Sequence, residues 1–511
     1  MNNSHPKGLT TLFFTEMWER MSYYGMRGIL VLFMTASITE NGLNMDPVTA
    51  SAIYGIYASL VYLVTLPGGW IADRILGQQR SILYGGIIIM FGHFLLAMPN
   101  GNVFYLGLSF VVIGTGLLKP NISALVGALY DENGGNRESG FTIFYMAINI
   151  GSILGFFICG YLGENIGWHY GFSAAGFGML LGLVQFIYLR KYLGKAGSEP
   201  QIKLTKRQRS KDIRYIIAGF LILFLIYFLS IFNVITLEPI SIAKFLTLFI
   251  LIISISYFVY LFLLGKLTLS EKKKVTLIGI LFIGAAFFWS GFDQAGSSFN
   301  IFAKEFTDRQ IGNWIYPASW LQILNPALVV ILSPFIAYIW IYLGKKSLDP
   351  SLPFKFGLGL ILMSIGFVFI TIGANVALQE GLAGAEWLLL TYLFHTLGEL
   401  TLSPIGLSAI SSLSPKRFMG QMMGVWFLAS SLGAIIAGLI SGQATHSGLQ
   451  SMPTLFSDIA IFSASIGLIL ILISRFLTKW VFGGKSWAGK KRLMNLKIER
   501  NSLKKWVEKK S

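Results

Sequence analysis

The fold is indicated first by a charged, glycine-rich turn, which reads Gly68-Gly69-Trp70-Ile71-Ala72-Asp73-Arg74-Ile75-Leu76-Gly77-Gln78-Gln79-Arg80. It separates two apolar blocks at 48–72 and 81–98. Glycines let neighbouring helices approach closely, and an aspartate can cap a helix or form a pair across a helix contact. We therefore expect this turn to hold two helices together.

The composition around this turn is that of an integral membrane protein. Of 511 residues, 54% are hydrophobic and only 12% are charged, whereas soluble domains contain about a quarter charged residues. The apolar residues form blocks of about twenty or more, the length that a hydrocarbon core near 30 Å requires. We predict an all-α protein with fourteen transmembrane helices, near 10–37, 48–72, 81–98, 102–128, 139–163, 169–190, 213–233, 241–265, 275–300, 319–343, 354–376, 385–412, 418–443 and 455–481.

The net charge of +17 is concentrated in alternate loops and in the tail. The segment 190–211 holds eight basic residues against one acid, and the segment 485–510 holds ten against two. This distribution follows the positive-inside rule and predicts that both termini are cytoplasmic. Contact with anionic lipid headgroups explains the basic tail better than nucleic-acid binding does.

The chain divides at its basic linker. Short matches in the same order relate the last six spans to the first six: Pro67 to Pro334, 117–120 to 401–404, and 144–151 to 426–433. These matches favour two parallel six-helix halves. We expect an N-terminal bundle at 1–190, a linker with two extra helices at 191–274, a C-terminal bundle at 275–481 and a basic tail at 482–511. The two extra helices are interpreted as a peripheral hairpin without chemistry.

The first apolar block contains an unusual charged turn. Glu16, Glu19 and Arg20 lie three and four residues apart, so they share one face of a helix. A single charge at mid-membrane costs about 2.5–3.5 kcal/mol on insertion scales. We infer that these groups face a polar cavity, with Glu16 paired to Arg20, and that they handle protons and anions.

In the rest of the membrane-spanning region, the two halves contribute charges of opposite sign to a shared site. Arg20 and Lys119 belong to the N-terminal half, and Asp293 and Glu399 belong to the C-terminal half. This polarity suits a zwitterion, with its amine at Glu399 and its carboxylate at Arg20 and Lys119. A structural ion pair between Lys119 and Asp293, which would also act as a gate, is the alternative.

Further candidate substrate contacts are amides, aromatic residues and one serine at comparable depth. Asn149 and Asn325 would hold polar groups of the substrate, unless they only bond neighbouring helices. The aromatic residues would form amphipathic walls, although the two tryptophans can also serve in packing. This set comprises Tyr23, Tyr24, Tyr62, Asn149, Trp289, Asn325, Ser403 and Trp426.

The turn at 68–80 is similar to the loop signature of the major facilitator superfamily. This resemblance implies a role in gating, for which the candidate residues are Gly69, Asp73, Arg74, Gly77 and Arg80. The chain as a whole resembles the proton-dependent oligopeptide transporters, the peptide branch of that superfamily. Their first-span signature appears as Glu16-Met17-Trp18-Glu19-Arg20-Met21-Ser22-Tyr23-Tyr24-Gly25. Their later signatures appear at 141–152, at Lys119-Pro120-Asn121, and at Glu399 with Ser403-Pro404.

The resemblance implies uptake of di- and tripeptides driven by an inward proton gradient, by alternating access. It implies proton coupling through Glu16, Glu19 and Asp293, with the roles above for the other charges. A deprotonated Glu16 or Glu19 would hold Arg20 until protonation releases it, and Lys119 with Asp293 would form a second switch. Asp293 stands where many members carry glutamate, which is longer by one methylene, and Met21 replaces their phenylalanine.

We expect a monomer in the bacterial inner membrane that has no enzymatic activity, catalytic residue, cofactor or metal site. The single cysteine, Cys159, excludes an intramolecular disulfide, and the sequence lacks a Walker-type loop for ATP-driven transport. The alternatives are a channel or membrane enzyme, a transporter of another small anion or a peptidomimetic, and a peptide-sensing receptor.

Overall fold

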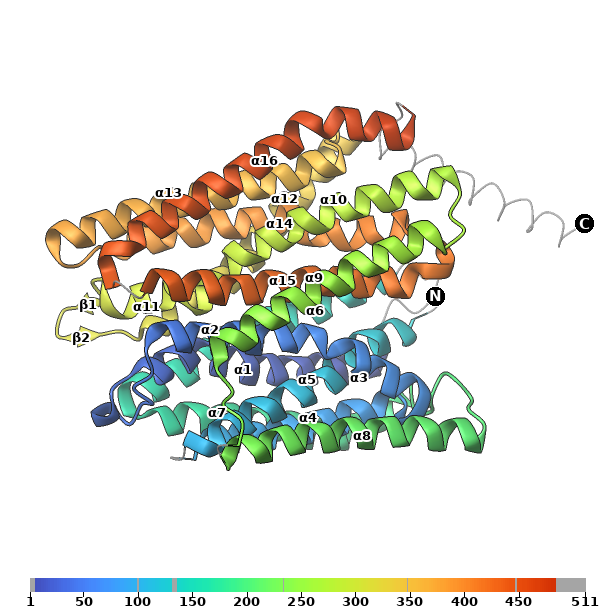
Figure 1. Cartoon of the computed structure of the whole chain (residues 1–511), viewed down its shortest axis with the longest axis horizontal. Coiled ribbons are helices and arrows are strands. Elements are labelled where there is room, and N and C mark those ends of the chain that lie inside the picture. The colour runs from blue at the N-terminus through green and yellow to red at the C-terminus, as the bar shows by residue number, and fades with distance from the viewer. Residues whose placement is uncertain are drawn as a thin grey trace, which may run out of the picture.

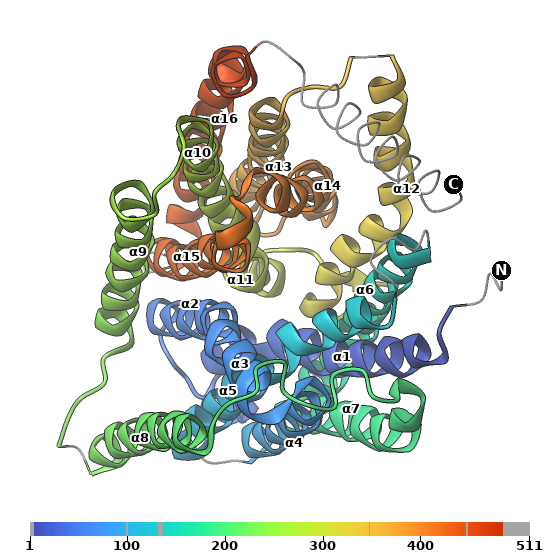
Figure 2. The ribbon, with the colours of Figure 1, turned by 90° about the vertical axis from the view of Figure 1, so that its right-hand side faces the viewer.

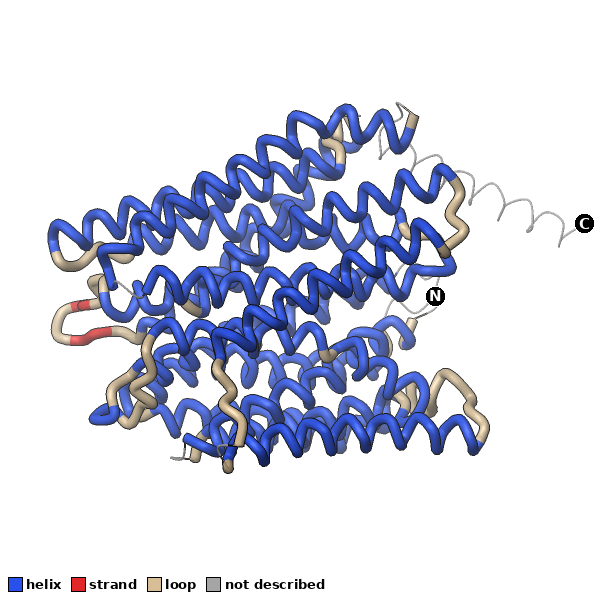
Figure 3. The backbone as a smooth tube through the Cα atoms, in the orientation of Figure 1, coloured by secondary structure: helices blue, strands red, loops and turns tan. Residues whose placement is uncertain are grey.

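A computed structural model of the chain describes residues 5–98, 101–130, 136–232, 234–346, 348–445 and 448–483. These residues are almost entirely helical, apart from connecting loops and one small hairpin of two strands (Figure 3). The predicted basic tail lies outside the described residues from residue 484 onward.

The N-terminal half begins with α1 (Lys7–Thr35) and ends with α7 (Trp168–Leu189). The helices between them are α2 (Pro47–Leu63), α3 (Thr65–Ile71), α4 (Gln78–Leu96), α5 (Gly101–Ala128) and α6 (Asn136–Tyr161), with short segments η1 (Ile38–Glu40), η2 (Ala72–Leu76) and η3 (Leu162–Ile166). Asp46 caps α2, since its side chain accepts a hydrogen bond from the Thr49 amide at 3.0 Å. Helices α2 and α3 and segment η2 form one span.

After η4 (Arg190–Leu193), the inserted helices are α8 (Lys206–Ile231) and α9 (Pro239–Leu263). The C-terminal half contains α10 (Leu269–Phe292), η5 (Asp293–Gly296), α11 (Ser298–Glu305), β1 (Gln310–Ile311), β2 (Trp314–Ile315), η6 (Ala318–Ile323), α12 (Leu324–Lys345), α13 (Leu352–Glu380), α14 (Glu386–Leu413), η7 (Lys416–Phe418), α15 (Met419–Thr445), η8 (Gly448–Ser451) and α16 (Met452–Phe482). Strands β1 and β2 pair antiparallel, with Ile311 opposite Trp314.

The predicted fourteen spans are confirmed among the described residues. Twelve helical segments are long and apolar enough to cross a membrane by length and composition alone. The remaining two are α1, with 29 residues, and α14, with 28. Charged side chains within these helices, namely two glutamates and two arginines in α1 and Glu399 in α14, lower their mean hydropathy.

The two halves form two groups of helices that run side by side (Figures 1 and 2). Helix α2 of the first group packs along α15 of the second through small residues. The Ser59 and Ser431 hydroxyls lie 2.8 Å apart, and Gly55 and Gly438 bring the two backbones into contact. We call the side where α1 begins the near side and the side where α1 ends the far side.

The two inserted helices lie apart from one another in Figure 2. Helix α9 packs against both α2 and α15, and the hydroxyl of Tyr257 donates to Gln421 Oε1 at 3.0 Å. Helix α8 lies beside α4 in both ribbon views, and its Asp212 pairs with Arg74 (Figures 1 and 2). The insertion therefore contacts both halves.

The glycine-rich turn allows the close helix contact that its composition predicts. A Cβ placed on Gly68 would lie 1.9 Å from the backbone oxygen of Gly116 in α5, whereas one placed on Gly69 would meet nothing closer than 3.9 Å. Helix α3 can therefore approach α5 only because Gly68 has no side chain.

We expect Gly68→Ala to destabilise the protein by about 1–3 kcal/mol, because the added methyl group forces α3 and α5 apart. Thermal unfolding of the detergent-solubilised protein measures this as a lower midpoint. Gly69→Ala is the matched control, and equal midpoints for the two variants would contradict the packing argument.

Candidate functional site

The charged turn of α1 forms the predicted ion pair. Arg20 Nε lies 2.9 Å from Glu16 Oε1 and 2.5 Å from Glu19 Oε2, and the three residues are at most 3% exposed. A second nitrogen of Arg20, Nη2, is buried without a hydrogen-bond partner among the described residues. The spacing along one helix thus brings both carboxylates to one guanidinium, as the sequence indicated.

Lys119 approaches this cluster from α5. Its Nζ lies 4.3 Å from the centre of the Tyr62 ring, where it makes a cation–π contact. Tyr62 belongs to α2 and lines the central cavity. Lys119 thus contacts a cavity residue without being among the residues that line the cavity.

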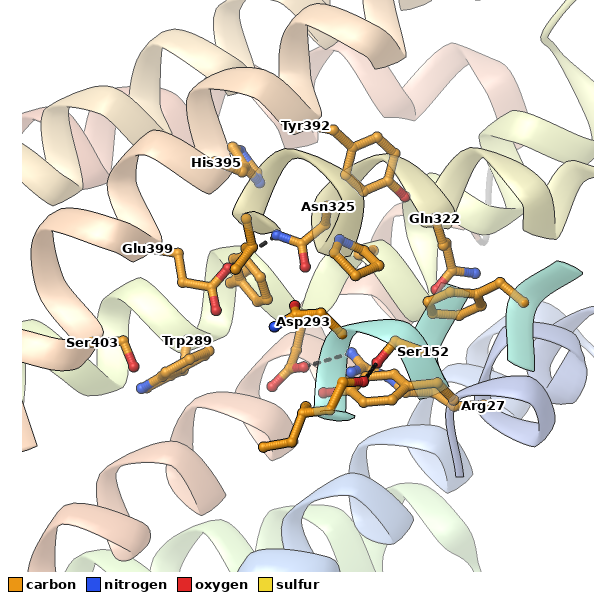
Figure 4. A pocket seen from close by; sticks show the side chains of 18 of the residues that line it. Arg27, Ser152, Trp289, Asp293, Gln322, Asn325, Tyr392, His395, Glu399 and Ser403 are labelled. Carbon is orange, nitrogen blue, oxygen red and sulfur yellow. Dashed lines mark hydrogen bonds and ion pairs between the residues drawn. The ribbon is translucent and has the colours of Figure 1, made fainter. Parts of the chain in front are cut away.

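The central cavity lies between the halves and has a volume of about 170 Å³. Eight predicted site residues line it: Tyr24, Tyr62, Asn149, Trp289, Asp293, Asn325, Glu399 and Ser403. Both halves contribute lining side chains, and in Figure 4 Arg27 and Ser152 come from the N-terminal half while the other labelled residues come from the C-terminal half.

Six predicted site residues do not line this cavity: Glu16, Glu19, Arg20, Tyr23, Lys119 and Trp426. Tyr23 is buried against Tyr57, whose ring lies parallel to it at 6.3 Å. Trp426 is 4% exposed and fills the space over Gly406, with Phe356 at its edge. The expectation that Trp426 forms a wall of this cavity is therefore wrong for this conformation, and the packing interpretation holds.

The buried partner of Asp293 is Arg27. Asp293 Oδ1 lies 2.7 Å from Arg27 Nη2, and Arg27 Nε donates to the Tyr54 hydroxyl at 2.6 Å (Figure 4). The alternative pair between Lys119 and Asp293 is not formed in this conformation, in which Asp293 pairs with Arg27 instead. The shorter aspartate side chain is sufficient for this contact across the halves.

The acidic end of the cavity is formed by Glu399 on α14. Asn325 Nδ2 donates to Glu399 Oε2 at 2.9 Å and lies 3.1 Å from the Thr396 hydroxyl oxygen. Asn325 thus bonds a neighbouring helix and lines the cavity at the same time. Asn149 Nδ2 donates to the backbone oxygen of Tyr145 within its own helix and also lines the cavity.

The candidate gating loop contacts the linker. The Ile202 amide donates to the Asp73 backbone oxygen at 2.9 Å, and Arg74 Nε lies 2.8 Å from Asp212 Oδ2. Gly77 has a φ of +78°, where a side chain would be strained, and it lies against the linker backbone. Arg80 is exposed. The loop is therefore held against the linker and the start of α8.

The sequence interpretation missed several cavity residues, of which Arg27 is the most important. Arg27 follows Arg20 by seven residues, so it lies two turns farther along the same face of α1. This spacing could have identified Arg27 as a candidate site residue from the sequence. The other missed polar lining residues are Tyr145, Ser152, Gln322, Tyr392 and His395.

A carboxylate at the far side was also missed. Glu164 in η3 accepts hydrogen bonds from the Ala318 amide at 2.9 Å, the Ser319 amide at 2.9 Å and the Ser319 hydroxyl at 2.7 Å. Lys304 Nζ lies 3.7 Å from it, and the Glu164 side chain is only 2% exposed. This group joins the N-terminal half to the start of η6 in the C-terminal half.

Comparisons with known proteins agree with this architecture. The model of the POT family matches residues 79–455. The chain is 40% identical over 479 residues to the peptide transporter YePEPT of Yersinia enterocolitica, covering 92% of this chain and 94% of that one. It is 37% identical over 488 residues to a di-/tripeptide transporter of Lactococcus lactis subsp. cremoris, covering 93% and 96%.

A solved structure has the same fold. The crystal structure of peptide transporter POT in complex with sulfate superposes with a TM-score of 0.88 at 36% identity, covering 94% of this chain and 96% of that one. The fold is therefore the expected major facilitator fold, with two six-helix halves and two inserted helices. This protein, with its buried charges facing a cavity between two such halves, is a multi-pass membrane protein that belongs to the POT family.

Proposed function

We propose that this protein is a proton-coupled symporter that takes up di- and tripeptides by alternating access. One observation carries the proposal: a single cavity between the halves places the carboxylate of Glu399 and the guanidinium of Arg27 on facing elements. A peptide has an ammonium at one end and a carboxylate at the other, so its charges match such a cavity. Membership of the POT family supports the same function.

In this proposal the peptide amine binds Glu399 and Asn325, which are already hydrogen-bonded to each other at 2.9 Å. The peptide carboxylate binds Arg27, the cation that lines the cavity directly. Trp289 and Tyr62 also line the cavity and supply apolar surface that the side chains of the peptide can contact.

Proton coupling follows from competition for Arg27. Asp293 occupies the guanidinium at 2.7 Å, and a neutral carboxylic acid would bind it far more weakly. A proton on Asp293 therefore releases Arg27 for the peptide carboxylate. Glu16 and Glu19 hold Arg20 in the same way, and their protonation would free Arg20 to act with Lys119 as a second site for the carboxylate.

The bundles at 1–190 and 275–481 are proposed to move as two bodies. The near side is proposed to be cytoplasmic, because the basic linker lies there, and the far side is extracellular. At the far side Glu164 holds η6, and Asn300 Nδ2 donates to the Gly28 backbone oxygen at 2.7 Å. These contacts support an inward-facing conformation. We further propose that the protein works as a monomer in the bacterial inner membrane, a location that its bacterial relatives support.

We expect purified protein in proteoliposomes to accumulate dialanine and trialanine when an inward proton gradient is imposed, and not alanine or nitrate. In this proposal a single amino acid does not bind Glu399 and Arg27 at the same time, and nitrate has no amine. A protonophore should abolish the accumulation. Uptake of alanine without dialanine would contradict the proposed substrate class.

We expect Asp293→Asn to abolish gradient-driven dialanine uptake, because the neutral amide cannot alternate between charged and uncharged forms. Counterflow exchange of dialanine should continue, since Arg27 is then free to bind the carboxylate. The exposed Asp308→Asn is the matched control. Gradient-driven accumulation at the wild-type level in Asp293→Asn would exclude this residue as the coupling group.

We expect Glu164→Ala to open the far side more often. The change removes three hydrogen bonds between the halves, and each contributes about 1 kcal/mol net. In a Cys159→Ala background, labelling of Ala295→Cys in the cavity by an impermeant thiol reagent from outside should be roughly fivefold faster or more.

The control for this labelling experiment is Glu305→Ala, which removes an exposed carboxylate at the same side. It should leave the labelling rate unchanged. Equal rates in the Glu164→Ala variant and the control would show that Glu164 does not hold the halves together.

A further inference from the structure

One wall of the cavity carries Gln322, a polar residue that has no role in binding the charged ends of the proposed peptide substrate. Gln322 lies in η6, three residues before Asn325, and lines the cavity. The start of η6 is fixed by Glu164, which binds the amides of Ala318 and Ser319. Trp320 fixes the segment further, because its Nε1 donates to the Phe157 backbone oxygen at 3.0 Å. The position of Gln322 is therefore set by the fold.

The amide of Gln322 is buried without being satisfied. The residue is only 4% exposed, and among the described residues its Nε2 has no hydrogen-bond partner. An unsatisfied buried polar group is unfavourable, so such groups in proteins usually have a partner. The other two cavity amides differ, since Asn149 and Asn325 donate to protein oxygens.

The surroundings of Gln322 are neutral. Tyr392 of α14 also lines the cavity, is 4% exposed, and lies on the same side as Gln322 in Figure 4. The hydroxyl of Ser152 on the facing wall donates to the Ile148 backbone oxygen within its own helix. Arg27, which Figure 4 also labels, is paired with Asp293 at 2.7 Å. A charged side chain placed here would lose hydration without gaining an opposite charge.

We propose that Gln322, together with Tyr392, forms a neutral polar subsite that favours peptides with a hydroxyl or carboxamide side chain. The inference rests on the proposed function, because the charged ends of the peptide must bind Arg27 and Glu399 to place a side chain here. A carboxamide both donates and accepts hydrogen bonds, and so does a threonine hydroxyl. An apolar side chain of equal size leaves the Gln322 amide unpaired.

The test compares threonine with valine, which have the same shape and differ in one hydroxyl. Ala-Thr and Ala-Val, and then Thr-Ala and Val-Ala, compete with labelled dialanine for uptake into proteoliposomes. In at least one order the threonine peptide should inhibit at roughly fivefold lower concentration, as a net hydrogen bond predicts. Gln322→Leu should reduce this ratio to about one, and Tyr392→Phe should reduce it in part.

The control is Gln310→Leu, the same chemical change on the exposed hairpin, which should keep the wild-type ratio. Gln322→Met, which retains the side-chain length, serves if the leucine variant does not fold. A wild-type ratio of one in both orders, or the same ratio in wild type and Gln322→Leu, would overturn the subsite while leaving peptide transport intact. Absence of any dialanine uptake would instead refute the proposed function.

Discussion

The ion pair between Arg27 and Asp293 is the interaction on which the rest of the site depends. It joins α1 to the end of α10, and both groups are less than a tenth exposed. Removing one partner of a buried pair costs roughly 3–5 kcal/mol, because the other charge is left uncompensated. The halves can therefore separate at this point only when something else neutralises Arg27. A peptide carboxylate can do so, and a proton removes the charge of Asp293 at the same step.

The two arginines of α1 are held in different ways, and this difference matters for movement. Arg20 pairs with Glu16 and Glu19 within its own helix, so a rigid movement of the N-terminal half leaves that cluster unchanged. Arg27 pairs with a residue of the other half, so the same movement must break its contact. Substrate and proton act most directly on a contact that the conformational change itself breaks.

Sequence reasoning succeeded where the chemistry lies within one helix. The three-and-four-residue spacing of Glu16, Glu19 and Arg20 dictates their contact, and the length of the apolar blocks dictates the spans. Sequence reasoning did not identify the partner of Asp293, because that partner depends on how the two halves are positioned relative to each other along the membrane normal. It failed for Trp426 for a similar reason, since the gap that Gly406 leaves for the indole exists only after α14 and α15 pack.

Two polar residues on one wall of the cavity differ in their hydrogen bonding and therefore in the roles that we propose for them. Asn325 and Gln322 are three residues apart, and from sequence both are amides at the start of a span. Asn325 falls opposite Glu399 and donates to it, whereas Gln322 Nε2 has no hydrogen-bond partner among the described residues. The first amide therefore orients a charge that belongs to the protein. The second amide is available to a substrate group that accepts a hydrogen bond, and in the proposed subsite that group is a side chain of the peptide.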